Sequence, residues 1–275
     1  MTNAALPAYL PTPCLLVGDA HLGVATPESE RALISWFRHA PTVAKSVVIM
    51  GDLFDFWFAW KHAMPRRGYR VLAAIADLAD AGVPVVWIGG NHDCWRGDAL
   101  ERETGARYTL NPWHGSIGSW RAELAHGDGL RDIEDASYRR LRTVLRNPLA
   151  IRAFGWLHPD WSSALAMSSS KKSRHMRALD GGNALLQVAT KRLSEPNGPD
   201  LIVHGHTHVP RLERAGYGTY GNAGAWYIDQ QYLRIDEEHI SRLSWKETGD
   251  SEVLGTVNRV NKERIAPVEK LLGKV

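Results

Sequence analysis

Five short polar clusters constrain this sequence most, and each of them comes directly after a run of apolar residues. They contain the types of side chain that commonly bind metal ions in proteins, and a glycine precedes the polar residue in several of them. In chain order the clusters are Asp19-Ala20-His21, Gly51-Asp52-Leu53-Phe54-Asp55, Gly90-Asn91-His92-Asp93, His126-Gly127-Asp128 and His204-Gly205-His206-Thr207-His208. Buried strands that end in such loops would bring polar side chains from distant segments to one place.

The apolar runs and the segments between them predict an α/β fold. Buried strands are expected at 14–17, 47–50 and 85–88, and amphipathic helices at 27–39, 69–81 and 99–104. Strands and helices that alternate at this spacing are typical of a sheet with crossover helices. Antiparallel strands are expected between 108 and 126, and the sheet is expected to resume at 201–203 and to continue to 240.

The segment between the fourth and fifth clusters has a different character. It shows no clear strand pattern and several helical stretches, which predicts a helical insertion over the α/β body. We therefore divide the chain into 1–134 (first part of the core), 135–193 (helical cap), 194–252 (second part of the core) and 253–275 (a charged tail that could form a helix).

The predicted cap is also more basic than the rest of the chain. Residues 131–192 contain 12 Lys and Arg against 5 Asp and Glu, whereas the whole chain has a net charge of only +3. Such a segment indicates an anionic partner or surface, although a solvated charged face explains it equally well. Trp156 and Trp161 lie in the same segment, and tryptophan beside arginine suits a membrane interface, a lipid-binding groove or simply a core.

Other bulk features exclude some classes of protein. No run of eighteen apolar residues is present, and the N-terminus lacks a basic start followed by an apolar stretch, so neither a spanning helix nor a secretory signal is expected. Two cysteines, Cys14 and Cys94, predict a protein of the reducing cytoplasm. Cys94 lies two residues from His92, but a small, half-buried side chain is the better interpretation than a nucleophile.

The five clusters match the needs of a two-metal phosphoester hydrolase. Two divalent ions about 3.5–4 Å apart can bind a phosphoryl group from both sides and activate a water molecule. Such a site uses carboxylates, imidazoles and amide oxygens, and one carboxylate has to bridge. Asp52 is the carboxylate that we place between the two ions. A glycine before Asp52, Asn91 and His206 would let each of these residues approach without a Cβ clash.

In this order the clusters resemble the motifs of the calcineurin-like metallophosphoesterases. The resemblance implies a four-layer α/β/β/α sandwich with two divalent metal ions, Mn²⁺ first and Fe or Zn as alternatives. It also implies that Asp52 and His92 are catalytic, His92 by stabilising the phosphate in the transition state or protonating the leaving oxygen. By the motif one ion would take Asp19, His21, Asp52 and His208, and the other Asp52, Asn91, His126 and His206.

Beyond the ligands, the motif contains three further carboxylates. Asp55, Asp93 and Asp128 would orient the ligand side chains, and turn or capping residues are an almost equally good interpretation of them.

A closer resemblance covers roughly residues 15–227. Gly51 to Phe58, His126 to Leu130 and Trp156 to Asp160 are similar to segments of bacterial UDP-2,3-diacylglucosamine pyrophosphatases, in the branch that reads Gly-Asn-His-Asp. This resemblance implies cleavage of a lipid A precursor to UMP and 2,3-diacylglucosamine 1-phosphate, with the cap holding the acyl chains at the inner membrane surface. The residues expected near substrate are Asn91, His92, Asp135, Lys171, Lys172, Arg174 and His206, with Asp135 near the sugar.

Two departures from that family affect the substrate pocket. The best-known enzymes carry Arg where this chain has His92, so the phosphate contacts must differ. Residues 168–174 also lack an Asn at the place expected for a substrate contact.

Two alternative functions remain open at this stage. A soluble phosphodiesterase or nucleotide pyrophosphatase would keep the chemistry and use a substrate without acyl chains. A non-catalytic metal-binding scaffold would dock a partner, but such scaffolds usually lose a ligand or the histidine of Gly-Asn-His, and this chain keeps them. No nucleic-acid partner is expected, and the oligomeric state is not predicted.

Overall fold

Two β-sheets form the centre of the computed structural model, which describes residues 5–60, 62–95, 98–161, 180–246 and 248–259. Within these residues one sheet has the order β1-β6-β7-β8-β10-β9 and the other β13-β12-β11-β2-β3-β4-β5. The strands are β1 (Tyr9–Leu10), β2 (Cys14–Val17), β3 (Ser46–Ile49), β4 (Val85–Ile88), β5 (Arg107–Thr109), β6 (Trp113–Ile117), β7 (Trp120–Leu124), β8 (Leu201–His204), β9 (Arg211–Ala215), β10 (Gly218–Asn222), β11 (Gln231–Ile235), β12 (His239–Trp245) and β13 (Ser251–Asn258).

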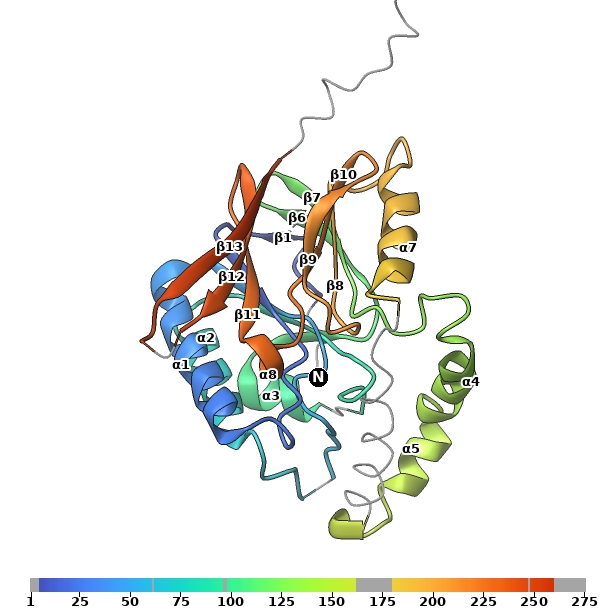
Figure 1. The fold of residues 1–275 in the computed structure, drawn as a ribbon. Helices are drawn as coiled ribbons and strands as arrows, with labels where there is room; N and C mark the ends of the chain where they lie inside the picture. Colours follow the sequence, from blue (N-terminus) through green and yellow to red (C-terminus); the bar gives the residue numbers. More distant parts are fainter. Residues whose placement is uncertain (1–4, 61, 96–97, 162–179, 247, 260–275) are drawn as a thin grey trace, which may run out of the picture.

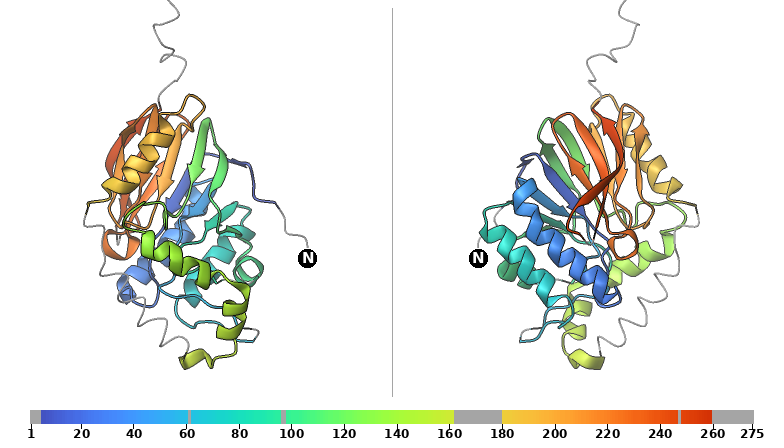
Figure 2. Two further views of the ribbon diagram at one scale, coloured as in Figure 1. Left: turned by 90° about the vertical axis from the view of Figure 1, so that its right-hand side faces the viewer. Right: turned by 60° about the vertical axis from the view of Figure 1, so that its left-hand side comes forward.

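Helices cover the outer faces of both sheets. The helices are α1 (Pro27–Val43), α2 (Tyr69–Asp80), α3 (Ala99–Thr104), α4 (Ala136–Leu145), α5 (Pro148–Phe154), α7 (Asn183–Leu193) and α8 (Trp226–Asp229). Figure 2 shows α1 and α2 side by side over one sheet and α7 along the other. This arrangement confirms the predicted α/β/β/α sandwich.

Alternation along β2 shows how the sequence builds these layers. Leu15 and Val17 pack with the apolar faces of α1 and α2, whereas Cys14 and Leu16 belong to the core between the two sheets. Successive side chains of a strand point to opposite faces, so a strand covered on both sides must be apolar at every position. A third, smaller core of Ala189, Leu193 and neighbouring strand residues lies beneath α7.

The predicted elements agree with the structure except at several boundaries. α3 is found at the predicted residues, and α1 begins at Pro27 as predicted, with the Thr26 side chain accepting a hydrogen bond from the Ser29 amide at 3.2 Å. The helix ends four residues later than predicted, at Val43. β5 lies at the start of the region predicted to be antiparallel, but it pairs parallel to β4.

Two predictions about the later part of the chain are wrong. The tail from 253 is not helical at its start, because β13 pairs antiparallel with β12 through residue 258. The predicted cap also extends too far, since α7 packs on the six-stranded sheet as the outer layer of the sandwich. Charge alone cannot distinguish an exposed edge strand from an exposed helix, because both leave polar residues in water.

α4 and α5 are the described helices that stand apart from the sandwich, and Figure 1 shows them to one side of it. They meet the core through the Trp95 indole, whose Nε1 donates to the Leu145 carbonyl at 2.5 Å, and through Phe154. The Phe154 ring lies 4.8 Å from that of Trp95 and 5.0 Å from that of Phe58. The division of the chain into core and cap remains a prediction, now limited to these two helices and the residues next to them.

Candidate metal centre

The five polar clusters all follow the carboxyl ends of strands that lie next to one another. β2, β3 and β4 are parallel neighbours in one sheet, and β7 and β8 are parallel neighbours in the other. The loops after these strands therefore open at the same end of the sandwich. This pairing of the strands explains how residue 19 meets residue 208, which the motif implied.

One group of predicted ligands consists of Asp19, His21 and His208. One ligand atom from each lies within 4.8 Å of the other two. His21 Nε2 lies 3.1 Å from His208 Nε2, and His208 Nε2 lies 3.3 Å from Asp19 Oδ1. Asp19 and His21 are fully buried, so a cation bound here would exchange most of its water for protein ligands.

A second group lies beside the first and consists of Asp52, His126 and His206, again within 4.8 Å. The Asn91 side chain joins it, with Oδ1 3.0 Å from His206 Nδ1. A third combination, His21 with Asp55 and His92, also satisfies the distance criterion. In that combination Asp55 Oδ1 faces His21 Nδ1 at 3.2 Å, so the carboxylate is engaged behind the imidazole and not at its open side.

Asp52, the carboxylate predicted to lie between the two ions, belongs to the second of these groups. Its Oδ1 accepts from the His92 amide at 2.9 Å, and its Oδ2 lies 3.2 Å from His126 Nε2. Burial by itself would raise the pKa of Asp52, but His126 and His92 face the carboxylate and hold its pKa well below the usual range. The group is therefore ionised, as a bridging ligand must be.

The histidines also have the protonation behaviour of a cation site. Burial lowers the pKa of His21, which keeps this imidazole neutral. Burial would lower the pKa of His126 as well, but the Asp52 carboxylate raises it well above its ordinary value. His126 Nε2 is buried and, among the described residues, has no partner in hydrogen-bond geometry. A divalent cation fits this nitrogen and would replace its proton.

The backbone at the ligands is unusual. Asp19, His21, Asp52, His206 and His208 all have positive φ, between 44° and 67°. Side chains other than glycine rarely adopt this region, and each such residue costs about 1 kcal/mol or more. The sharp turns were expected at glycine, and the positive φ of the ligand residues themselves was not predicted.

The glycines in these loops do have the predicted role of allowing close approach. A Cβ on Gly51 would lie 2.5 Å from His126 Nδ1, and one on Gly90 would lie 2.1 Å from Asp52 Oδ1. A Cβ on Gly205 would lie 2.7 Å from an Asp19 oxygen. A larger residue at any of these positions would push a ligand out of place.

The three additional carboxylates differ in what they hold. Asp55 accepts from His21 Nδ1 and so orients an imidazole, as expected. Asp93 accepts from the amides of Gly90 and Leu53 at 2.6 and 3.0 Å, and thus ties two ligand loops together. Asp128 contacts the cap instead, because its Oδ2 accepts from the Tyr138 hydroxyl at 2.7 Å.

The predicted substrate residues are only partly described. Asn91, His92 and His206 lie at the centre of the site, whereas Lys171, Lys172 and Arg174 lie outside the described residues. Asp135 is buried and holds Arg131, with Oδ1 2.6 Å from the Arg131 Nη2 atom. Arg131 was not singled out in the sequence, where it is one arginine among many in a basic segment.

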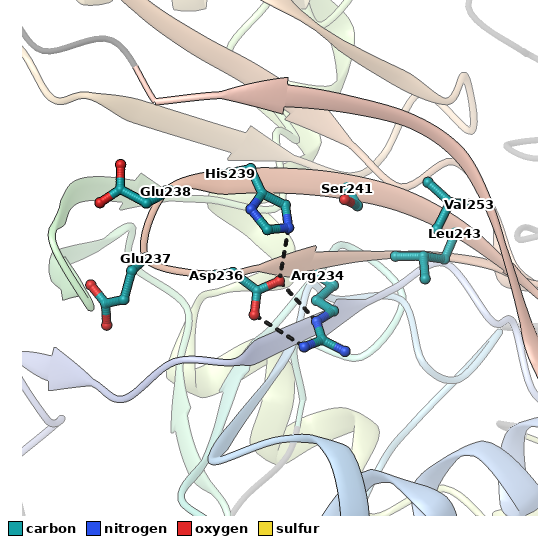
Figure 3. Close-up of a pocket in the computed structure, with 8 residues that line it drawn as sticks. All are labelled: Arg234, Asp236, Glu237, Glu238, His239, Ser241, Leu243 and Val253. Atoms are coloured by element: carbon teal, nitrogen blue, oxygen red, sulfur yellow. Dashed lines mark hydrogen bonds and ion pairs between the residues drawn. The ribbon is translucent and has the colours of Figure 1, made fainter.

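Two other features carry no chemistry. Burial raises the pKa of Cys94 to about 12, which favours the inert interpretation of this thiol. A separate cavity of about 510 Å³ lies at the β11–β12 hairpin, where Figure 3 shows Arg234 and His239 both directed at Asp236. These charged groups pair with one another and lie on a different part of the chain from the ligand loops.

None of the helices in the described part of the chain has the length and apolar character that a membrane span needs.

Comparisons with known proteins agree with this geometry. The family model for calcineurin-like phosphoesterase matches residues 12–210. A UDP-2,3-diacylglucosamine hydrolase of Porphyromonas gingivalis is 38% identical over 160 residues, which cover 57% of this chain and 61% of that protein. Proteins of the same name from Pseudomonas fluorescens and Ralstonia nicotianae are 28% and 29% identical, over 82% and 84% of this chain and 92% of each relative.

Proposed function

Because this chain belongs to the calcineurin-like phosphoesterase family, and is thus a metal-dependent phosphoester hydrolase, we propose that it cleaves the pyrophosphate of UDP-2,3-diacylglucosamine. The products would be UMP and 2,3-diacylglucosamine 1-phosphate. The observation that carries this proposal is the pair of adjacent ligand groups, one of which contains Asp52, in a chain similar to hydrolases of this substrate.

The proposed ligand assignment is the one that the family motif implies. One divalent cation would bind Asp19, His21, Asp52 and His208, and the other would bind Asp52, Asn91, His126 and His206. His126 Nε2, which faces Asp52 Oδ2 at 3.2 Å, and the neutral imidazole of His21 support this assignment. Carboxylate, imidazole and amide oxygen together suit Mn²⁺, and Fe or Zn would accept the same donors.

When bound, the two ions neutralise charge on the phosphoryl oxygens and activate a water molecule. The part of the protein would be to hold the substrate phosphate beside Asp52, in ligand loops whose geometry is fixed before the substrate arrives. The strained backbone at five ligand residues is the physical form of this preorganisation. A site that is already arranged does not have to reorganise during the reaction.

His92 is proposed to handle the proton and to stabilise charge. Its Nδ1 lies 2.8 Å from the Asp55 carbonyl oxygen. A carbonyl oxygen can only accept, so Nδ1 carries a hydrogen. Nε2 lies 3.9 Å from Asp52 Oδ2, at the inner side of the site. A protonated Nε2 in this place can stabilise a phosphoryl oxygen and give its proton to the leaving phosphate.

The cap supports an acylated substrate and a peripheral position on the inner membrane. Leu149, Trp156 and Trp161 are 76%, 82% and 77% exposed, and arginines lie among them on α4 and α5. Exposed apolar side chains beside basic ones suit acyl chains and anionic lipid headgroups. A cytoplasmic protein that acts at the inner membrane surface would use them in this way.

The test of this proposal is a product analysis with the metal-loaded enzyme. We expect UDP-2,3-diacylglucosamine to give UMP and the acylated sugar 1-phosphate in Mn²⁺, and we expect a chelator to stop the reaction. Release of UMP from a non-acylated nucleotide sugar such as UDP-glucose at the same rate would instead favour a soluble nucleotide pyrophosphatase.

A further inference from the structure

Arg131 is a cationic side chain that contacts the candidate metal centre from outside the five clusters. It follows the loop of His126 and precedes α4, and its side chain is only 11% exposed. The Nη2 atom lies 3.3 Å from His206 Nε2. A guanidinium in this position would face whatever anion the two ions bind.

Asp135 holds that guanidinium in one orientation. Its Oδ1 accepts from Arg131 Nε at 3.1 Å and from Nη2 at 2.6 Å, and its Oδ2 accepts from the Arg131 amide at 3.0 Å. Three hydrogen bonds from one residue to one buried carboxylate leave the long side chain little freedom. The entropy that an arginine normally loses on binding a ligand is therefore already lost here.

The same guanidinium retains unused donors. Among the described residues no hydrogen-bond partner is found for Arg131 Nη1, which carries two N–H groups. A nearly buried guanidinium with free donors is a good binding group for a phosphate oxygen, since its planar fork matches that geometry. Asp135 cannot fill this role, because an ionised carboxylate has no hydrogen-bond donor and repels a phosphate oxygen.

His206 links this arginine to the metal ions. Arg131 can only donate, so His206 Nε2 is the acceptor and its Nδ1 carries the hydrogen that faces Asn91 Oδ1. His206 Nε2 also lies 3.8 Å from Asp135 Oδ1, so the arginine, the carboxylate that holds it and a proposed metal ligand lie together.

We infer that Arg131 binds a non-bridging oxygen of the substrate phosphate, and that Asp135 is the residue that positions it. The inference rests on the proposed function only in taking the substrate to be a phosphate ester. It gives Asp135 a role other than the predicted contact with the sugar. It also places a guanidinium at the phosphate in a chain that has His92 where similar enzymes have arginine.

A purely structural role is the competing explanation, and the neighbouring Arg139 provides the control for it. Arg139 donates from Nη1 to the Arg131 carbonyl at 2.6 Å and from Nη2 to the Asp132 carbonyl at 2.7 Å. It therefore stabilises the same loop with the same charge, but its bonds are to the backbone of the loop. If Arg131 only held the loop, the alanine variants of the two arginines should behave alike.

The experiment is the binding of inorganic phosphate to the Mn²⁺-loaded protein, measured by titration calorimetry. We expect Arg131→Ala to weaken phosphate binding by about 10- to 100-fold, the range for one lost charge-assisted pair. Two Mn²⁺ ions per chain should be retained, and Arg139→Ala should change binding less than threefold. Weakening below tenfold in Arg131→Ala, or equal weakening in both variants, overturns the inference. If Arg131→Ala does not fold, Arg131→Gln takes its place under the same criteria.

A kinetic measurement separates positioning from binding. Asp135→Asn should lower kcat/KM on its own, but it should have little further effect in an Arg131→Ala background, because it acts through the arginine. Added guanidinium ion should restore activity to Arg131→Ala and not to Asp135→Asn. Additive effects, or no rescue, contradict the inference. Failure of the proposed substrate would appear separately, as a wild-type enzyme that binds phosphate but leaves UDP-2,3-diacylglucosamine intact.

Discussion

The ligand loops and the cap helices are built on opposite physical principles, although both face the same site. The ligand loops are buried, follow parallel strands and hold five residues at positive φ. α4 and α5 contain no buried residue, and they attach to the core through a few contacts such as Trp95 with Phe154. The ligand loops have a fixed geometry that includes strained backbone, whereas α4 and α5 leave apolar and basic side chains exposed to a partner.

This difference teaches where specificity is expected to lie. Rigid ligand loops can perform the same hydrolysis on many phosphate esters, since they contact the phosphate and not the rest of the substrate. An exposed, weakly attached cap can select among those esters by what it covers. Substitutions in the ligand loops should therefore lower the hydrolysis of every substrate alike, and substitutions in the cap should lower that of acylated substrates most.

The largest effect is expected from Asp52→Ala. Loss of the shared carboxylate should reduce turnover by about 10⁴-fold, or about 5.5 kcal/mol, on any phosphodiester substrate. The metal content, measured by elemental analysis, should fall below two ions per chain. Unchanged metal content with full loss of turnover would mean that Asp52 acts in some other way than as a ligand.

The next largest effect is expected from His92→Ala. Its Nε2 lies 3.9 Å from Asp52 Oδ2, so kcat should fall by about 10²- to 10³-fold, in the range of general acid catalysis. Two metal ions should remain bound, because His92 is not a proposed ligand. A variant that stays fully active would refute the role of His92, and one that loses its metal would make it a ligand.

A smaller effect is expected from Asp55→Ala, which removes the acceptor behind His21. Partners of this kind typically contribute 10- to 100-fold to metal affinity, so activity should fall and recover as Mn²⁺ is raised. Asp128→Asn is the matched control, because its contacts are to Tyr138 and the cap. If Asp128→Asn required the same rise in Mn²⁺, the two carboxylates would not differ as described.

The smallest effect tests the cap directly. Replacing Leu149 and Trp156 together by serine should raise KM for the acylated substrate by about fivefold and leave a small phosphodiester unchanged. Both side chains are highly exposed, so the melting temperature should stay within about 2 °C. An equal rise in KM for both substrates would mean that these residues stabilise the ligand loops and do not contact the acyl chains.

The same contrast explains what could be predicted from the sequence. That the five clusters meet was predictable because each cluster follows an apolar run, and a glycine precedes Asp52, Asn91 and His206 where close approach is needed, as at Gly90 beside Asp52. The positive φ at Asp19 or His208 was not predictable, since it is imposed by the assembled loops.

The cap was less predictable because its residues are not specified by burial. Arg131 could not be distinguished from Arg139 in the sequence, and only the position of Asp135 separates them in the structure. The pairing of β13 with β12 was missed for a similar reason, since an exposed edge strand carries the same polar residues as a tail.

The most direct measurement compares two substrates side by side in Mn²⁺ with a chelator control. One is UDP-2,3-diacylglucosamine, and the other is the same UDP-sugar without acyl chains. Our account predicts release of UMP from both at rates that the chelator abolishes, with kcat/KM at least tenfold higher for the acylated substrate. Equal or better cleavage of the non-acylated substrate would contradict it.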